Sequence, residues 1–361
     1  MAGRIVLFGA TGYTGELTAR ALVARGGAPV LAGRSRERVE ALAAELGGLE
    51  PAVADVGRPE TIRALLEPGD VLVSTVGPFV RWGRAALDAA IDAGAHYIDS
   101  TGEPPFIRAV FEDHDTAAQD AGAGLLTAFG YDYVPGNLAG ALALRDAGER
   151  AVSVDIGYFV GAGAAPSGGT RASAAGMLAE PAYAFSGGRL VTERTARRVR
   201  SFDGRPAVSI GATEQFALPR VHPGLRDVRV WLGWFGPASR PLQAISAATS
   251  LATRLPGVRG AIEATAGRLV KGSTGGPDAA ARAQARSFVV ALASDAAGVP
   301  LAEVRLEGDN PYDFTGALLA WGAIAAAGGA LRGAGALGPV DAFGLDALAA
   351  GVAAAGIARR T

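Results

Sequence analysis

The segment Arg4–Gly15 reads RIVLFGATGYTG and decides the fold of the chain. Its apolar start predicts a short buried strand, and its glycines predict a tight turn into a helix over Thr14–Arg25. Gly9 permits the tight turn, and Gly12 lets a pyrophosphate approach the backbone without meeting a Cβ atom. Gly15 lets the helix pack closely on the sheet. Strand, turn and helix in direct succession therefore predict a binding site for a dinucleotide.

Backbone N–H groups at the start of this helix carry the chemistry of the predicted site. They attract phosphates together with the partial positive charge of the helix end. The alternative is a tight turn that holds no ligand. The loop that ends the fourth predicted strand is expected to pass close to the inner ribose and nicotinamide of the cofactor. The residues predicted to bind the cofactor in these two loops are Gly9, Thr11, Gly12, Tyr13, Thr14, Gly15, Thr75, Val76, Gly77 and Pro78.

The end of the second predicted strand indicates which dinucleotide binds. An NAD enzyme commonly ends this strand with a carboxylate that binds the ribose 2′-OH. This chain has Arg34, Ser35 and Arg36 there. Two guanidiniums and a hydroxyl suit a 2′-phosphate, so we predict NADP(H) as the cofactor. The alternative is a solvated helix start, although arginines there oppose the helix dipole. Asp55, after the third strand, is expected either to lie near the adenine or to cap the next helix.

Strands and helices alternate throughout residues 1–135. This order predicts an α/β fold with a Rossmann-type, doubly wound parallel sheet. The expected strands are 4–8, 29–32, 50–54, 71–76, 96–99 and 124–129. The expected helices are 14–25, 35–46, 59–66, 83–93 and 105–121.

The pattern changes after Pro135, and residues 136–312 predict a second α+β domain with a mixed or antiparallel sheet. This domain is expected to shape the substrate site or to join two chains. Residues 313–361 predict a helical tail that packs back on the first domain. In the second domain, strands are expected over 152–160, 190–202, 206–210, 228–235, 285–293 and 301–307, and helices over 170–182, 243–254 and part of 259–278.

Composition narrows the class of protein. A length of 361 residues suggests about two domains, and 49% hydrophobic with 19% charged residues is typical of a globular chain. A net charge of −1 gives no field that would hold a nucleic acid. The chain has no cysteine and three scattered histidines, which predicts no metal site and excludes thiolate chemistry. The N-terminus lacks the pattern of a signal peptide, so we expect a cytoplasmic protein.

The stretch Phe314–Leu331 is uncharged and close to the minimum length for a bilayer span. It consists mostly of alanine and glycine, which add little energy of transfer into lipid. We therefore expect a buried helix that packs through small residues. Membrane association is the less favoured alternative.

Four motifs accompany the glycine-rich loop: AGRS at 32–35, VGPF at 76–79, HYIDSTGE at 96–103 and FGYDYVPG at 129–136. With them the chain resembles the saccharopine dehydrogenase-like superfamily. Within that superfamily it is most similar to actinobacterial trans-acting enoyl reductases, which work with polyketide or lipid-assembly enzymes, and GGTRAS at 168–173 points to that branch. The resemblance implies NADPH binding, a Rossmann domain completed by C-terminal residues, and an inserted α+β domain that shapes the substrate site.

Hydride transfer needs a proton donor or an electrostatic stabiliser near the reacting carbon. Ligands of such sheets bind beyond the C-terminal strand ends, where two loops supply the predicted catalytic residues Tyr131, Tyr133 and Asp99. Either tyrosine could donate a proton or only pack. Asp99 and Glu103 could orient the substrate or the cofactor ribose, or close a turn. The Tyr-x-x-x-Lys pair of short-chain dehydrogenases is absent, because Lys271 is the only lysine and no tyrosine stands four residues before it.

These features favour an NADPH-dependent reductase of an activated double bond, such as the C=C bond of an enoyl thioester or a related biosynthetic intermediate. The substrate is expected to be a small or carrier-bound molecule of apolar character. A homodimer joined through the sheet of the second domain is one option. The alternatives are a saccharopine-type C=N reductase or amino-acid dehydrogenase, and a non-catalytic NADP-binding sensor.

Overall fold

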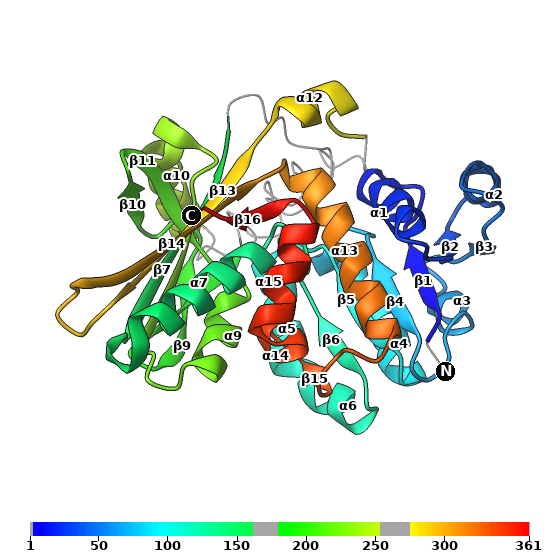
Figure 1. Ribbon diagram of the computed structural model, residues 1–361, viewed down its shortest axis with the longest axis horizontal. Coiled ribbons are helices and arrows are strands. Elements are labelled where there is room, and N and C mark those ends of the chain that lie inside the picture. The colour runs from blue at the N-terminus through cyan, green and yellow to red at the C-terminus, as the bar shows by residue number, and fades with distance from the viewer. Residues whose placement is uncertain (1–2, 162–179, 253–274, 361) are drawn as a thin grey trace. The chain divides into compact units, whose positions relative to one another are not determined.

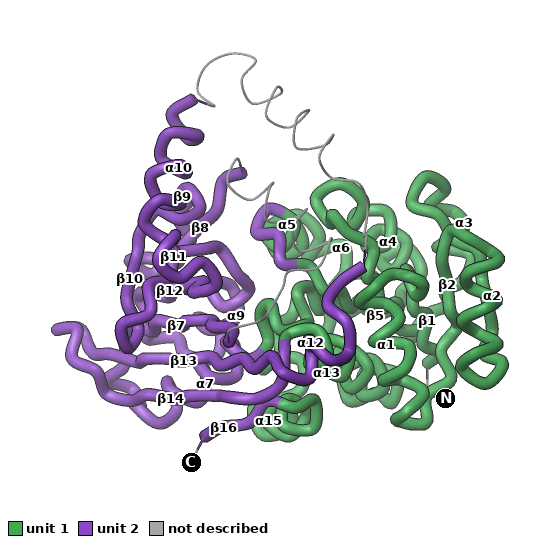
Figure 2. Tube along the Cα trace, turned by 90° about the horizontal axis from the view of Figure 1, so that it is seen from above, with its two compact units in different colours: residues 1–101, 106–134, 311–356 green, residues 102–105, 135–310, 357–361 purple. Residues whose placement is uncertain are grey.

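The computed structural model describes residues 3–161, 180–252 and 275–360 (Figure 1). The chain divides into two compact units, shown in different colours in Figure 2. Unit 1 consists of residues 1–101, 106–134 and 311–356, and unit 2 consists of residues 102–105, 135–310 and 357–361.

Unit 1 contains a seven-stranded sheet in which neighbouring strands are parallel. The strand order is β15-β6-β5-β4-β1-β2-β3, so the direction of winding reverses beside β1. Every residue of β1, β2 and β4 is buried, as expected for strands of a parallel sheet covered on both faces. The predicted Rossmann-type, doubly wound sheet is confirmed. Its strands are β1 Ile5–Phe8, β2 Val30–Gly33, β3 Pro51–Val53, β4 Val71–Ser74, β5 His96–Asp99, β6 Gly124–Leu126 and β15 Gly335–Ala336.

Helices connect these strands and cover the sheet (Figure 1). Helix α4 ends at Gly94, which adopts the left-handed conformation common at helix C-termini. The helices that contribute to unit 1 are α1 Tyr13–Ala24, α2 Arg36–Glu45, α3 Pro59–Arg63, α4 Phe79–Ala93, α5 Pro104–Asp113, α6 Asp115–Asp120, α13 Pro311–Ala327, α14 Pro339–Phe343 and α15 Leu345–Ala354.

Helix α13 contains most of the uncharged stretch Phe314–Leu331 and packs against α1, β4 and β5. Small residues permit this packing. A Cβ atom added at Gly316 would lie 3.1 Å from the backbone of Leu17, and one added at Gly322 would lie 2.5 Å from the Phe129 ring. The stretch therefore forms a buried helix, the favoured of the two alternatives. No helix of the described ranges is long and apolar enough to cross a bilayer.

Across the described residues, unit 2 contains a nine-stranded mixed sheet, which confirms the predicted second α+β domain. Strands β7 and β12 are parallel, whereas the other neighbouring strands of the described sheet are antiparallel. The strands are β7 Ser153–Val160, β8 Pro181–Ser186, β9 Arg189–Arg194, β10 Val199–Phe202, β11 Arg205–Ile210, β12 Asp227–Leu232, β13 Ser287–Ser294, β14 Pro300–Gly308 and β16 Ile357–Arg359. The helices in the described part of this unit are α7 Val134–Ala147, η1 Gly148–Arg150, α9 Glu214–Val221, η2 Gly236–Ala238, α10 Ser239–Ala252 and α12 Ala279–Gln284.

Three local expectations need correction. The single strand expected over 190–202 is two strands, β9 and β10, because the chain turns between them at Ala196, which has a φ of 55°. The C-terminal tail is not only helical, since β15 joins the first sheet and β16 the second. These strands are two and three residues long, too short to produce a periodic pattern. Most of the helices expected over 170–182 and 259–278 lies outside the described residues, but Pro181 begins a strand.

Candidate functional site

The glycine-rich loop has the geometry that its three glycines require. Gly9 has a φ of +87°, a conformation that residues with a Cβ atom rarely adopt. The Gly12 N–H donates to the Gly9 carbonyl oxygen at 2.9 Å, which closes the turn. A Cβ atom added at Gly15 would lie only 2.1 Å from that same oxygen. Helix α1 begins immediately after this turn, so its first backbone N–H groups point out of the C-terminal edge of β1.

The loop after β4 lies beside the glycine-rich loop. Strands β1 and β4 are adjacent, with Phe8 opposite Ser74. The Thr75 hydroxyl lies 3.2 Å from the carbonyl oxygens of both Phe8 and Gly9, to which it donates. The peptide bond between Gly77 and Pro78 is cis, and Pro78 precedes the first residue of α4. Two loops that were predicted from separate motifs are thus joined at the point where the sheet reverses its winding.

Guanidiniums gather at the end of β2. Arg34 is exposed, and its side chain makes no hydrogen bond or ion pair within the described ranges. Arg36 is exposed and lies 3.4 Å from Glu40, an interaction that contributes little at a surface. The Arg38 guanidinium donates to the carbonyl oxygen of Thr11 at 2.7 Å and so fixes the glycine-rich loop from the next helix.

Arg38 was not among the predicted residues, although Arg34, Arg36 and Arg38 stand at every second position. Ser35 is the residue before α2, and its side chain makes no capping hydrogen bond.

Asp55 closes a local turn. Its Oδ1 atom accepts from the Gly57 N–H at 2.9 Å, and its own N–H donates to the Thr61 hydroxyl at 3.0 Å. Helix α3 is preceded by Arg58, so the expectation that Asp55 caps this helix is wrong. A contact of Asp55 with the adenine stays a prediction.

Asp99 lies at the end of β5 and has no exposed surface. Its carboxylate accepts hydrogen bonds from the backbone N–H groups of Thr101 and Ala128, both at 2.8 Å, and from the Thr127 hydroxyl at 2.9 Å. Burial raises the pKa of Asp99 to about 6, and these hydrogen bonds oppose the rise. The carboxylate therefore joins the end of β5 to the loop after β6. A catalytic role of Asp99 stays a prediction.

The loop after β6 carries the two predicted tyrosines. Tyr131 and Tyr133 are each 2% exposed, and the Tyr131 ring packs edge-on against Phe314 with centroids 6.2 Å apart. The Tyr131 backbone N–H donates to the Thr315 hydroxyl at 3.0 Å, so α13 holds this loop. The same end of α13 reaches the glycine-rich loop, because Tyr312 packs edge-on against Tyr13 with centroids 5.3 Å apart.

Asp132 stands between the two tyrosines and was not among the predicted residues. The residue is partly exposed, but its Oδ1 atom is buried and has no hydrogen-bond partner within the described ranges. Burial raises the pKa of this carboxyl group to about 7. A carboxyl group at a C-terminal strand edge with an unsatisfied oxygen and a pKa near neutrality has the properties of a general acid. Its position in the motif FGYDYVPG, after the sixth strand, is the sequence feature that could have pointed to Asp132.

These features define the class of unit 1. A parallel sheet, a glycine-rich turn before the first helix and a second loop at the winding reversal form a Rossmann-type dinucleotide-binding unit. Residues 5–126 match the family model described as the saccharopine dehydrogenase NADP binding domain. This N-terminal part of the chain is similar to the NADP-binding domain of saccharopine dehydrogenases, as its motifs predicted, and NADP(H) is the cofactor of the matched domain.

Curated relatives match the same part of the chain. A protein of Mycobacterium tuberculosis, named only as a candidate trans-acting enoyl reductase, is 41% identical over 141 residues. A trans-acting enoyl reductase of Mycobacterium ulcerans is 38% identical over 140 residues. Each match covers 37% of this chain and 34% of the relative, so the chain matches about a third of the length of these proteins.

A solved structure extends the likeness to both units. Apo saccharopine dehydrogenase (L-Glu forming) of Saccharomyces cerevisiae has a TM-score of 0.59, and the match covers 99% of either chain. The two sequences are 13% identical, so the similarity concerns the fold.

Proposed function

We propose that this chain is an NADPH-dependent reductase that acts on an activated carbon–carbon double bond, with an enoyl thioester as the substrate class. The observation that carries the proposal is the joined pair of loops after β1 and β4, in a domain that matches an NADP-binding family. The names of the curated relatives support the choice of an enoyl substrate.

Different residues at the C-terminal edge of the sheet bind different parts of the cofactor in this proposal. The N–H groups at the start of α1 would hold the pyrophosphate, and Thr75 keeps their loop in place. Arg34 and Arg36 would pair with the 2′-phosphate, for which a planar guanidinium is well suited. NADPH, when bound, supplies the hydride that adds to the β-carbon of the enoyl thioester.

Addition of hydride leaves negative charge on the thioester oxygen and requires a proton at the α-carbon. Asp132 supplies this proton in our proposal, directly or through a water molecule, and is reprotonated from solvent. Its pKa of about 7 keeps a large fraction of the carboxyl group protonated at neutral pH, whereas an ordinary aspartate would be ionised. Tyr131 and Tyr133 remain alternative donors. Because both are buried, the loop would have to open before either hydroxyl could reach the substrate.

NADPH consumption tests the function. The panel contains an enoyl thioester, an α-keto acid with and without an amino acid, and a cyclic imine. Turnover of the enoyl thioester alone supports the proposal. Turnover only with the keto acid and amine, or with the imine, assigns the chain to C=N chemistry, and no turnover with tight NADPH binding favours the sensor.

Variants of the loop after β6 test the proton donor. Asp132→Asn should lower kcat about 100-fold or more, within the usual range for loss of a general acid. The matched variants Tyr131→Phe and Tyr133→Phe should change it far less. In the wild type, kcat should fall as the pH rises through about 7, because the donor must be protonated. A tyrosine variant as slow as Asp132→Asn, or a flat pH profile, would reassign the proton donor.

A further inference from the structure

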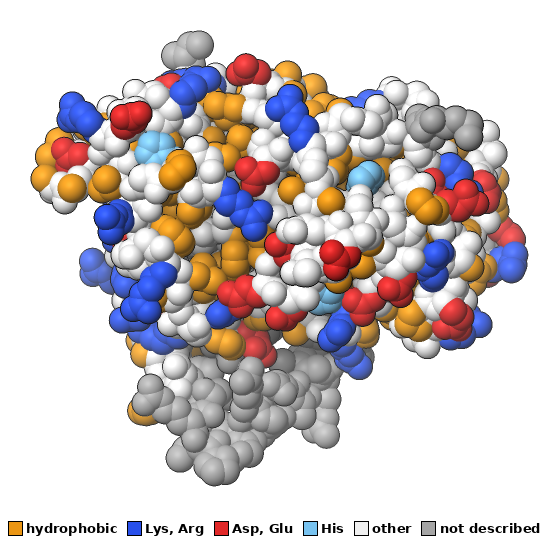
Figure 3. Space-filling view, turned by 90° about the horizontal axis from the view of Figure 1, so that it is seen from below, with side chains coloured by type: hydrophobic (Ala, Val, Ile, Leu, Met, Phe, Trp, Pro, Cys, Tyr) orange, Lys and Arg blue, Asp and Glu red, His pale blue; other side chains and the backbone are white. Residues whose placement is uncertain are grey.

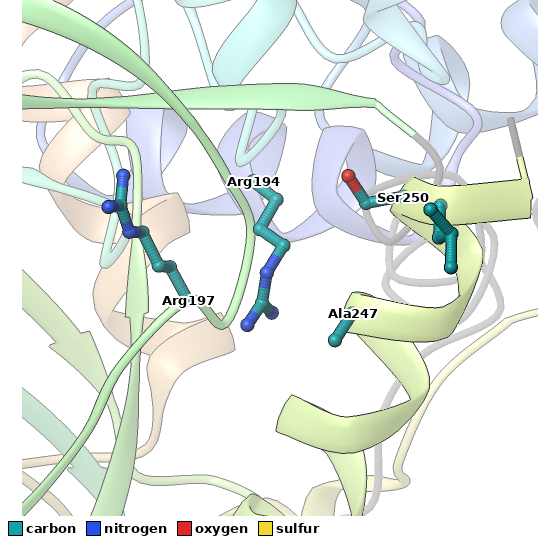
Figure 4. A pocket seen from close by; sticks show the side chains of 5 residues that line it. Arg194, Arg197, Ala247 and Ser250 are labelled. Atoms are coloured by element: carbon teal, nitrogen blue, oxygen red, sulfur yellow. The ribbon is translucent and has the colours of Figure 1, made fainter. Parts of the chain in front are cut away.

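Unit 2 contains a cavity of about 430 Å³ between the turn that joins β9 to β10 and one side of helix α10 (Figure 4). Its size is adequate for an anionic group with part of an attached chain. Two of the five lining residues are arginines, and the others are uncharged. The lining consists of Arg194, Arg197, Ala247, Ser250 and Leu251.

Arg194 is fixed in place by the protein. Its Nη1 atom donates to the carbonyl oxygens of Ala196 at 3.1 Å and Gln243 at 3.2 Å, and to the Ser246 hydroxyl at 3.2 Å. These three bonds use one nitrogen of a group that carries five N–H donors. Figure 4 shows the Arg194 side chain extending toward α10, with Ala247 across the gap. A guanidinium held in this way loses little freedom when an anion binds.

Positive charge around the cavity is only partly compensated. Glu193 is the acidic residue of β9, and its buried carboxylate is shared by Arg198 at 3.2 Å and Arg197 at 3.6 Å. Helix α10 contains no aspartate or glutamate, so the opposite wall adds no negative charge. Residues 189–240 contain ten arginines and four acidic residues. Figure 3 shows several Lys and Arg side chains on the left of that view, the side on which Figure 1 draws the strands of unit 2, and others across the rest of that face.

The remaining lining is apolar or neutral. Leu251 lines the cavity and is 66% exposed. Ala247 and Ser250 add a methyl group and a hydroxyl to the wall. The cavity therefore offers guanidiniums for an anion beside an uncharged surface for the chain attached to it.

We propose that this cavity binds the phosphate of the phosphopantetheine arm that carries the thioester substrate. The inference rests on the proposed function, because an enoyl thioester is delivered on an arm of this chemistry. A phosphodiester suits the guanidiniums, and the uncharged amide chain of the arm suits the α10 wall. The same arm occurs in coenzyme A and on carrier domains, so the experiment includes both.

Binding of pantetheine 4′-phosphate and of pantetheine to the full chain, measured by calorimetry, tests the proposal without turnover. The phosphorylated compound should bind about tenfold more tightly, as expected for a charge-assisted contact of about 1.4 kcal/mol. The advantage should decrease with added salt. Equal binding of the two compounds would overturn the proposal.

Two helix variants provide a matched control. Ala247→Glu places a carboxylate in the cavity and should abolish the preference for phosphate. Ala248→Glu makes the same change at an exposed neighbour that does not line the cavity and should leave the preference intact. Equal effects of the two variants would contradict the assignment. Arg194→Gln should behave like Ala247→Glu, with circular dichroism to verify its fold.

Turnover separates this inference from the proposed function. An enoyl thioester of N-acetylcysteamine, which has no phosphate, tests the reductase alone. If the chain reduces this thioester but binds pantetheine with and without phosphate equally, the cavity assignment is overturned and the proposed function stands. Phosphate binding that Ala247→Glu abolishes, without turnover of any thioester, would uphold the cavity and overturn the function. If Ala247→Glu slows turnover of a coenzyme A thioester, the arm can come from coenzyme A. If it slows only turnover of a carrier-bound thioester, the arm comes from a carrier domain.

Discussion

Asp132→Asn should change how the stability of the protein depends on pH. Burial raises the pKa of this carboxyl group from 3.8 to about 7 in the folded state. The folded protein therefore holds a proton that the unfolded chain releases. The stability linked to this proton is fully present below about pH 4 and is lost as the pH rises through about 7. Asparagine has no charge to bury and should not show this loss.

The size of the effect follows from the same pKa. A rise from 3.8 to about 7 corresponds to at most about 4 kcal/mol, at about 1.4 kcal/mol for each pKa unit. Because the residue is partly exposed, we expect about 2–4 kcal/mol. Asp132→Asn should thus be about as stable as the wild type near pH 4 and more stable by this amount near pH 8.

Urea unfolding followed by circular dichroism, at a series of pH values between these limits, measures the difference. Asp92→Asn, at an exposed position on α4, serves as the control and should run parallel to the wild type at every pH. If the curve of Asp132→Asn also runs parallel to the wild type, Asp132 ionises normally in the folded protein. The assignment of Asp132 as proton donor would then lose its physical basis.

Further predictions concern the cofactor loops. Arg34→Asp should weaken NADP(H) binding at least tenfold more than NAD(H) binding, whereas Arg25→Asp at the far end of α1 should affect neither. Fluorescence titration measures both affinities. Equal loss of affinity for the two cofactors would argue against a 2′-phosphate contact. Gly15→Ala should destabilise the fold more than Gly12→Ala, because their added Cβ atoms would lie 2.1 Å and 3.2 Å from the Gly9 oxygen; thermal unfolding should rank them in this order. Thr75→Val should weaken NADPH binding by about 1–2 kcal/mol, because it removes the hydroxyl that donates to the carbonyl oxygens of Phe8 and Gly9. Calorimetry measures this affinity, and an unchanged affinity would contradict the prediction.

The parallel sheet could be predicted because its signals are local. Apolar runs such as Ile5–Phe8 are buried on both faces, and glycines with positive φ mark the turns between elements. The antiparallel part was harder to predict, since its long ladders join distant segments. The break between β9 and β10 depends on one turn at Ala196, a residue without any preference for positive φ.

The candidate site could be predicted in part. The motif around Gly9 and the loop at Thr75 were recognised separately, and the register of β1 with β4 brings them together. Sequence could not show that the Asp99 carboxylate accepts from three donors, whereas Asp132, in the motif FGYDYVPG, keeps an unsatisfied oxygen. Such differences depend on burial, which neighbouring residue types alone do not reveal.

The packing of α13 and β15 into unit 1 has a consequence for synthesis on the ribosome. Strands β1 to β6 emerge early, but β6 receives its neighbour β15 only after residue 336 has been made. The face of α1 that meets Gly316 must likewise wait about 300 residues for its partner. At about 5–20 residues per second, the nucleotide-binding unit remains open at one side for at least about 15 seconds. We expect the nascent chain to need protection of its apolar surface during that interval, and to bind NADPH only near the end of translation.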